Sequence, residues 1–96
     1  MPTIRQSDTY RAWFSKLKDN RAKARIDIRI RRLSLGNAGD VKLVGAGISE
    51  LRINYGPGYR VYYTTIGKEV VVLLAGGDKS TQSRDIDKAK ELASNL

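Results

Sequence analysis

Two short segments that flank a Gly-Pro-Gly turn constrain the fold more than any other feature of the sequence. In residues 48–65, ISELRINYGPGYRVYYTT, apolar and polar side chains alternate on both sides of Gly56-Pro57-Gly58. Alternation with a period of two is typical of a β-strand that buries one face. The pattern therefore predicts a β-hairpin with one apolar side and one polar side.

The register of this hairpin can be predicted from the way the apolar residues match across the turn. We expect Tyr55 to pair with Tyr59, because this register puts the apolar residues of both strands on one side. A shift of one residue would mix the two sets. The polar side then presents Glu50, Arg52, Asn54, Arg60, Tyr62 and Thr64.

Three further segments are predicted to be strands. Residues 3–6 and residues 41–44 are short and partly apolar. Residues 69–75, EVVVLLA, form a continuous apolar run of strand length. Such a run is typical of a strand that is buried on both faces, so we expect it to be the central strand. Gly76-Gly77 is expected to end it in a turn, although its amides, with Lys79, could also hold an anion.

Three helices are predicted from capping residues and from apolar residues at helical spacing. The first follows a cap at position 7 or 8, the second covers about residues 21–35, and the third begins near positions 80–81. The element order predicts an α+β fold and a single domain spanning residues 1–96. We expect a small, mostly antiparallel sheet of about four to five strands. The N-terminal helical hairpin should pack on one face of the sheet, and a C-terminal helix should end the chain. The other face of the sheet should stay open.

The net charge restricts the classes of partner. The chain has 18 Lys and Arg residues against 10 Asp and Glu, a net charge of +8, and residues 1–35 carry most of the excess. This charge favours nucleic acid, acidic protein or an anionic membrane surface. Histidine and cysteine are absent. Imidazole and thiolate chemistry are therefore excluded, and we expect neither a metal site nor a cofactor.

The first residues of the chain and the lengths of its apolar runs indicate whether it carries a secretory signal or a membrane-spanning segment. MPTIRQSDTY lacks the apolar segment of a secretory signal. No apolar run approaches the roughly 20 residues that span a bilayer. We therefore expect neither a secretory signal nor a membrane-spanning segment, and a membrane is not among the expected partners.

The polar side of the hairpin is the candidate functional site. Arg52 and Arg60 can each bind a phosphate through two parallel hydrogen bonds, and Lys79 follows the central strand. Tyr62 could stack on a base or transfer a proton. An ordinary solvated sheet face with Arg–Glu pairs explains the same residues. Residue types alone leave both interpretations open.

Two segments carry a resemblance to a known superfamily. ISELRINYGPGYRVYY and VVVLLAGGDKSTQSRDI together resemble the RelE/ParE toxins of bacterial toxin–antitoxin modules, and more narrowly the HigB-like addiction-module killer group. The resemblance implies a small antiparallel sheet with two N-terminal helices and one C-terminal helix. It implies a bacterial cytoplasmic protein and no cofactor.

The resemblance also implies an activity and a set of partners. RelE-like members cut mRNA in the ribosomal A site, whereas ParE-like members inhibit DNA gyrase. An antitoxin encoded beside the toxin holds both kinds inactive. In the HigB-like group it is usually a helix-turn-helix protein (HigA-like), so that operator DNA is bound only indirectly, through the complex. The ribosome and mRNA are the remaining partners implied.

Residue roles follow from the same resemblance. Arg60 would bind the scissile phosphate, Arg52 would orient it or assist proton transfer, and Lys79 would stabilise or protonate the leaving oxygen. Further contacts to RNA would come from Lys42, Asn54, Tyr62 and Arg84. RelE-like nucleases often carry a Tyr or His in the C-terminal region, and this chain has no aromatic residue after Tyr63.

The leading hypothesis is therefore a toxin that acts as a ribosome-dependent, metal-independent mRNA endonuclease, in which the 2′-hydroxyl attacks the adjacent phosphate. Two alternatives stay open. One is a ParE-like gyrase inhibitor, and the other is a non-catalytic basic module that binds RNA or an antitoxin.

Overall fold

The computed structural model describes residues 2–96, which form one five-stranded mixed sheet with helices on both faces. The strands lie in the order β1-β5-β4-β3-β2, and β1 runs parallel to β5 while the other neighbours are antiparallel. The elements are β1 (Thr3–Gln6), α1 (Asp8–Lys16), α2 (Asn20–Ser34), β2 (Val41–Gly45), β3 (Ile48–Ile53), β4 (Tyr59–Ile66), β5 (Val70–Asp78), the 3-10 turn η1 (Lys79–Thr81) and α3 (Gln82–Ser94). The predicted α+β class and element order are confirmed.

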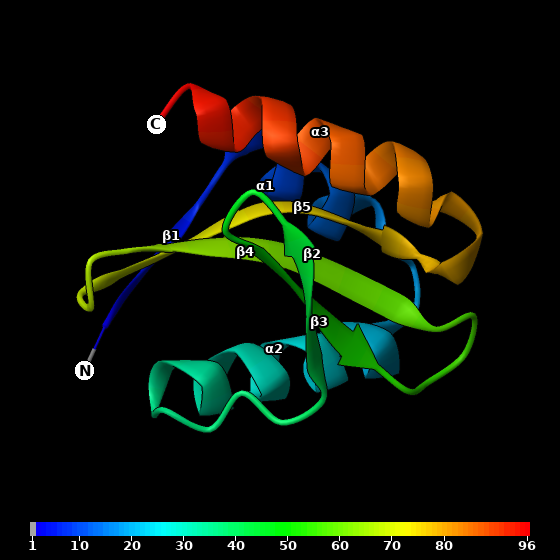
Figure 1. Ribbon diagram of the computed structural model, residues 1–96. Helices are drawn as coiled ribbons and strands as arrows, with labels where there is room; N and C mark the ends of the chain where they lie inside the picture. The colour runs from blue at the N-terminus through cyan, green and yellow to red at the C-terminus, as the bar shows by residue number, and fades with distance from the viewer. Residues whose placement is uncertain (1) are drawn as a thin grey trace.

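Helices α2 and α3 lie on opposite faces of the sheet (Figure 1), and an apolar cluster lies on each face. Helices α1 and α2 contribute Tyr10 and Ile26 to the first cluster. Helix α3 contributes Ala89 to the second, where it covers Tyr62. The expectation of an open sheet face is therefore wrong. Strand β5 is apolar on both faces, so both faces need a covering layer to keep it from water.

Side-chain caps fix the start of α1, α2 and η1. The Ser7 hydroxyl accepts a hydrogen bond from the Tyr10 N–H and donates one to the Leu74 carbonyl, which ties the start of α1 to β5. Asp19 caps α2 in the same way. Helix α3 begins at Gln82, and Thr81, one of the two predicted caps, occupies its N-cap position without a side-chain hydrogen bond. The 3-10 turn η1, which Asp78 caps, precedes it and was not predicted. Carboxylates at such positions satisfy free backbone N–H groups.

The hairpin register differs from the predicted one by two residues. Ile53 pairs with Tyr59 and Arg52 pairs with Arg60, so residues 54–58 form the loop. The Gly58 N–H donates to the Tyr55 carbonyl at 3.1 Å and closes this loop. A shift of two residues keeps every side chain on its predicted face, so the alternating pattern could not distinguish the two registers. The observed register makes Arg52 and Arg60 direct neighbours.

Gly76 and Gly77 do not form the predicted turn but lie inside β5. A Cβ atom on Gly76 would stand 2.2 Å from the ring of Trp13, and one on Gly77 would stand 1.8 Å from the Asp85 carboxylate. Both glycines thus allow a helix to approach the strand closely, α1 on one face and α3 on the other. Strand β5 lies between β1 and β4, so the middle strand is β4 rather than the predicted β5.

Gly76→Ala is expected to destabilise the protein by about 3 kcal/mol, because the added methyl group overlaps the Trp13 ring and forces α1 away from β5. The change is measured by urea unfolding. Gly67→Ala is the control: its methyl group would meet open space, so only the left-handed backbone conformation costs about 1 kcal/mol. Equal losses in the two variants would contradict close packing at Gly76.

Candidate functional site

A cleft of about 350 Å³ opens where the β3–β4 loop meets η1. It is lined by Asp40, Arg52, Asn54, Gly56, Pro57, Gly58, Arg60 and Lys79. Three of these side chains are basic and one is acidic. The cleft therefore brings together the three residues assigned to catalysis from the sequence, and it adds Asn54 from the predicted RNA-binding set.

Arg60 is the most enclosed of the basic residues in the cleft. Its side chain is 13% exposed, and its Nη1 donates to the carbonyls of Gly58 and Tyr59 at 3.3 Å each. Its buried Nε has no hydrogen-bond partner. An unsatisfied buried donor costs free energy that an incoming acceptor can recover. The nearest anionic oxygen is Oε1 of Glu50, 3.8 Å away, which is close enough for an ion pair but too far for a hydrogen bond.

Arg52 stands directly opposite Arg60 across the β3–β4 pair. Two like charges in this position would repel one another. The carboxylate of Glu50 lies between them: Arg52 Nε donates to Glu50 Oε1 at 3.1 Å, and Arg60 Nε is 3.8 Å from the same oxygen. Glu50 thus serves as the counter-ion that allows both arginines to line one cleft.

The Glu50 carboxylate is almost completely buried, with 1% of the residue exposed. Its other oxygen, Oε2, accepts hydrogen bonds from the Tyr62 hydroxyl and from Gln82 Nε2, both at 2.9 Å. Burial alone would raise its pKa, but the hydrogen bonds from Gln82, Arg52 and Tyr62 and the charge of Arg60 outweigh burial and lower the pKa. Glu50 is therefore ionised at neutral pH.

The role of Glu50 was missed from the sequence. The sequence places Glu50 on the polar side of the hairpin, which was expected to be open, whereas the structure makes it the buried centre of a network that joins β3, β4 and α3. The signal was the spacing of Glu50 and Arg52, two residues apart in a strand and therefore on one side of the sheet. The network could be predicted only with the correct register of the β3–β4 pair, in which Glu50 stands opposite Tyr62 and Arg52 stands opposite Arg60.

Lys79 reaches the cleft because of two local turns. Asp78 caps η1 by accepting from the Ser80 N–H at 2.8 Å, which sets the direction of the chain at Lys79. Gly58, with φ of 80°, brings the β3–β4 loop alongside. A Cβ atom at Gly58 would lie 3.5 Å from Arg60 Nη1 and 3.6 Å from Lys79 Cβ. The loop thus packs against both basic residues.

The other predicted RNA-binding residues do not line this cleft. Tyr62 is fully buried under α3, and burial and its hydrogen bond to Glu50 raise its pKa. Its placement on an open face was therefore wrong, and in this position it can neither stack on a base nor lose a proton readily. Lys42 is exposed on β2, opposite Glu50. Arg84 is exposed on α3, beside a separate shallow hollow.

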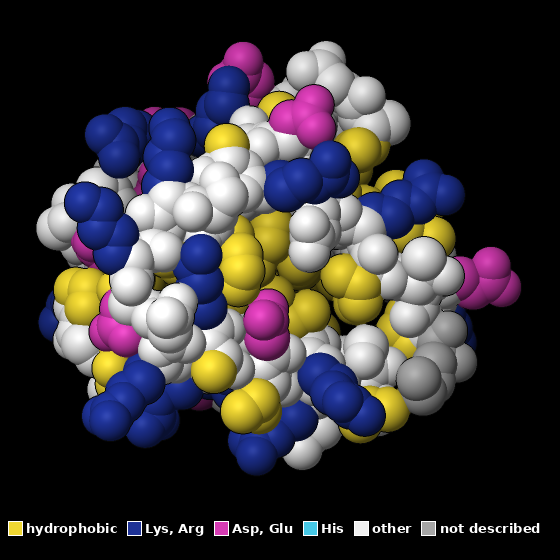
Figure 2. Space-filling view, turned by 180° about the vertical axis from the view of Figure 1, so that it is seen from behind, with side chains coloured by type: hydrophobic (Ala, Val, Ile, Leu, Met, Phe, Trp, Pro, Cys, Tyr) yellow, Lys and Arg dark blue, Asp and Glu magenta, His cyan; other side chains and the backbone are white. Residues whose placement is uncertain are grey.

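Basic side chains are not confined to the cleft. The face seen from behind also carries Lys and Arg side chains, which are scattered over it with several Asp and Glu side chains among them (Figure 2). Charge alone therefore does not locate a site, whereas the enclosure of Arg60 does. Within residues 2–96, no group of His, Cys, Asp and Glu side chains is placed to hold a metal ion. No helix in that range is long and apolar enough to cross a membrane.

Comparison of the sequence with known protein families identifies relatives that match nearly the whole chain. Residues 12–95 match the model of the family described as phage derived protein Gp49-like (DUF891). The chain belongs to this Gp49-like family. It is 55% identical over 93 residues to an uncharacterized protein of Haemophilus influenzae, and the match covers 97% of this chain and 94% of that protein.

Two solved structures share the fold. One is the intact RelBE toxin–antitoxin complex of E. coli, with 17% identity, a TM-score of 0.67, and coverage of 81% of this chain and 96% of that chain. The other is a double mutant of the E. coli toxin RelE in the free state, with 16% identity, a TM-score of 0.68, and coverage of 91% and 96%. The RelE-like fold that the sequence resemblance implies is thereby confirmed.

Glu50→Gln is expected to cost about 3 kcal/mol of stability at pH 7, because it leaves two neighbouring arginines without their counter-ion. The pKa of Glu50 is lowered on folding from 4.5, so its contribution is complete above about pH 4.5 and is lost as the pH falls through the folded value. The free energy of unfolding should therefore fall less steeply on acidification in Glu50→Gln than in the wild type.

Urea unfolding at pH 7, 4.5 and 3 measures both effects. Glu91→Gln is the matched control, since Glu91 is an exposed carboxylate that pairs with Lys88 at 3.5 Å. Exposed pairs contribute little to stability, so this variant should behave like the wild type. The network account is contradicted if the two Gln variants show the same stability and the same dependence on pH.

Proposed function

We propose that the chain is the toxin of a bacterial type II toxin–antitoxin module and that it cleaves mRNA on the ribosome. The observation that carries the proposal is the cleft in which Arg52 and Arg60 stand side by side on the Glu50 carboxylate. Arg60 Nε forms an ion pair with Glu50 but makes no hydrogen bond. The RelE-like fold and membership of the Gp49-like family support it.

The proposed reaction needs no metal. The RNA 2′-hydroxyl attacks the adjacent phosphorus while the bond to the 5′ oxygen of the next nucleotide breaks, which leaves a 2′,3′-cyclic phosphate and a 5′-hydroxyl. Negative charge grows on the phosphoryl oxygens, and donors already in position stabilise it. Arg60 holds the scissile phosphate and Arg52 orients it. Lys79, exposed at the rim, gives a proton to the leaving 5′ oxygen.

Proton removal from the 2′-hydroxyl falls to Asp40. It is the carboxylate that lines the cleft, whereas Glu50 is held by Arg52, Tyr62 and Gln82. Tyr62 is unsuited to the task, because its pKa is raised. General base catalysis of this kind contributes about 10²–10⁴-fold to the rate.

The remaining predicted residues receive secondary roles. Tyr62 positions the Glu50 carboxylate from below the surface and does not contact RNA. Asn54 lines the cleft and contacts the RNA beside the scissile phosphate. Lys42 and Arg84, both exposed and outside the cleft, attract more distant RNA.

The proposed partners follow from the same assignment. The protein acts in the bacterial cytoplasm on ribosome-bound mRNA. A helix-turn-helix antitoxin (HigA-like) encoded beside it holds it inactive, and only the complex contacts operator DNA. The solved relative in complex with its antitoxin supports a partner of this class.

Arg60→Ala is expected to slow mRNA cleavage roughly 10²–10³-fold, since it removes a preplaced donor to the phosphoryl oxygens. The measurement is a translation reaction on purified ribosomes in which the ends of the message are mapped. Arg5→Ala is the control: it removes the same charge from the exposed strand β1, and cleavage should persist. An intact message with the wild-type protein, together with inhibited gyrase supercoiling, would overturn the proposal in favour of a gyrase inhibitor.

Asp40→Asn is expected to lower the rate of cleavage about 100-fold while ribosome binding stays unchanged, because the amide cannot accept the 2′-hydroxyl proton. The same end-mapping reaction measures the rate, and co-sedimentation with ribosomes measures binding. Full activity in this variant would remove Asp40 from the mechanism without affecting the assignment of Arg60.

A further inference from the structure

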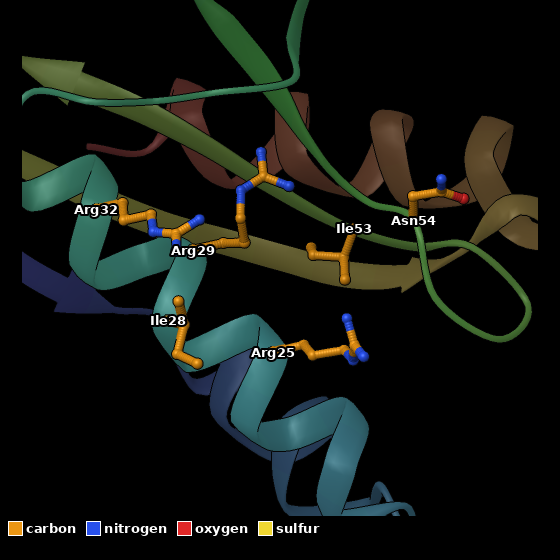
Figure 3. Close-up of a pocket in the computed structure, with 6 residues that line it drawn as sticks. All are labelled: Arg25, Ile28, Arg29, Arg32, Ile53 and Asn54. Carbon is orange, nitrogen blue, oxygen red and sulfur yellow. The ribbon is translucent and has the colours of Figure 1, made fainter.

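A second hollow, of about 230 Å³, lies between α2 and the end of β3 (Figure 3). It is lined by Arg25, Ile28, Arg29, Arg32, Ile53 and Asn54. The three arginines come from one side of α2, and no carboxylate is among the lining residues. Figure 3 shows the side chains of Arg25 and Arg29 extending from the helix toward Ile53 and Asn54.

This hollow adjoins the catalytic cleft. Asn54 lines both. Arg29 donates to the backbone carbonyl of Arg52, and its Nη2 donates to the carbonyls of Ala38 at 3.1 Å and Asp40 at 3.0 Å. Arg52 and Asp40 both line the cleft. One arginine of the hollow therefore contacts the backbone of two residues that line the cleft.

The positive charge in the hollow is not neutralised locally. Among residues 2–96, the ion pairs formed by arginine involve Arg11, Arg52, Arg60 and Arg84, and none involves an arginine of the hollow. The guanidinium of Arg29 is fixed by backbone carbonyls, which leave its charge uncompensated. The guanidinium of Arg25 lies 4.7 Å from the centre of the Tyr55 ring, which holds it over a flat surface.

We propose that this hollow binds the single-stranded RNA that continues from the scissile phosphate, with Arg25 and Arg32 on its phosphates. The proposal rests on the proposed function and deepens it by giving the path of the substrate. Guanidinium groups bind phosphate through paired hydrogen bonds, and arginine planes also stack on bases. Ile28, 50% exposed, and buried Ile53 give the hollow an apolar wall against which a base or sugar can pack.

An acidic protein segment has the same charge complementarity with these arginines. The position of the hollow favours RNA: a strand whose phosphate lies on Arg60 must leave the cleft, and a path past Asn54, which lines both, leads to the hollow. The sugar–phosphate backbone also repeats its charge at every nucleotide, which matches arginines spaced along one helix.

The test is equilibrium binding of a fluorescently labelled single-stranded RNA oligonucleotide to the purified chain, by anisotropy, at several salt concentrations. The double variant Arg25→Ala/Arg32→Ala should bind about tenfold more weakly. Its slope of log K against log salt should be smaller by about 1.4, at about 0.7 per lost phosphate contact. Arg29 is left intact, because its three hydrogen bonds hold the loop before β2 in place.

The matched control is Arg5→Ala/Arg31→Ala, which removes the same charge from exposed positions outside the hollow, one of them on α2. It should bind RNA within about twofold of the wild type. Equal losses in the two double variants would overturn the proposal, because the arginines would then act only through net charge. Normal RNA binding by Arg25→Ala/Arg32→Ala, with weaker binding of an acidic peptide, would overturn it in favour of a protein partner.

The binding test is separate from the test of cleavage. Arg60→Ala assesses the reaction, whereas the double variants assess RNA affinity whether or not the message is cut. A wild-type chain that binds RNA through Arg25 and Arg32 without cutting it would support the hollow and contradict the nuclease. A nuclease whose activity and RNA affinity both survive Arg25→Ala/Arg32→Ala would contradict only the hollow.

Discussion

The buried carboxylate of Glu50 is the interaction on which the cleft depends. The register of the β3–β4 pair sets Arg52 directly against Arg60, and this arrangement is tolerable only with a negative charge between them. A carboxylate can be buried there because hydrogen bonds from β4 and α3 compensate for its lost hydration. The fold and the site thus depend on the same contact. Gln82 of α3 holds the Glu50 carboxylate, and Glu50 in turn holds Arg52 and Arg60.

The periodic parts of the sequence predicted their structures well. The alternation in residues 48–65 identified both strands and both faces, and the apolar run near residue 72 identified a strand buried on both sides. The register was wrong by two residues, because such a shift leaves every side chain on its face. The role of Glu50 was missed for the same reason, since it depends on which residue stands opposite Arg52.

Two further differences arise from contacts between elements distant in sequence. Gly76-Gly77 has the composition of a turn, yet it serves close packing against Trp13 and Asp85, which no local pattern encodes. Tyr62 was placed on an open polar face, but α3 covers that face. The excess of Lys and Arg predicted the charge of the partner and not its location. The location that we propose rests on the enclosure of Arg60 and on the hollow beside Asn54.

The central claim is that the guanidinium of Arg60, which lines the cleft beside Arg52, receives a phosphate of RNA. Its Nε–H signal in nitrogen-15 NMR reports this contact most directly. The titrant is a short RNA whose 2′-hydroxyls are methylated, so that it cannot be cut. The account predicts that the Nε–H signals of Arg60 and Arg52 shift together and saturably, while that of Arg5 stays in place. Unmoved signals from Arg60 and Arg52 at RNA saturation would contradict it.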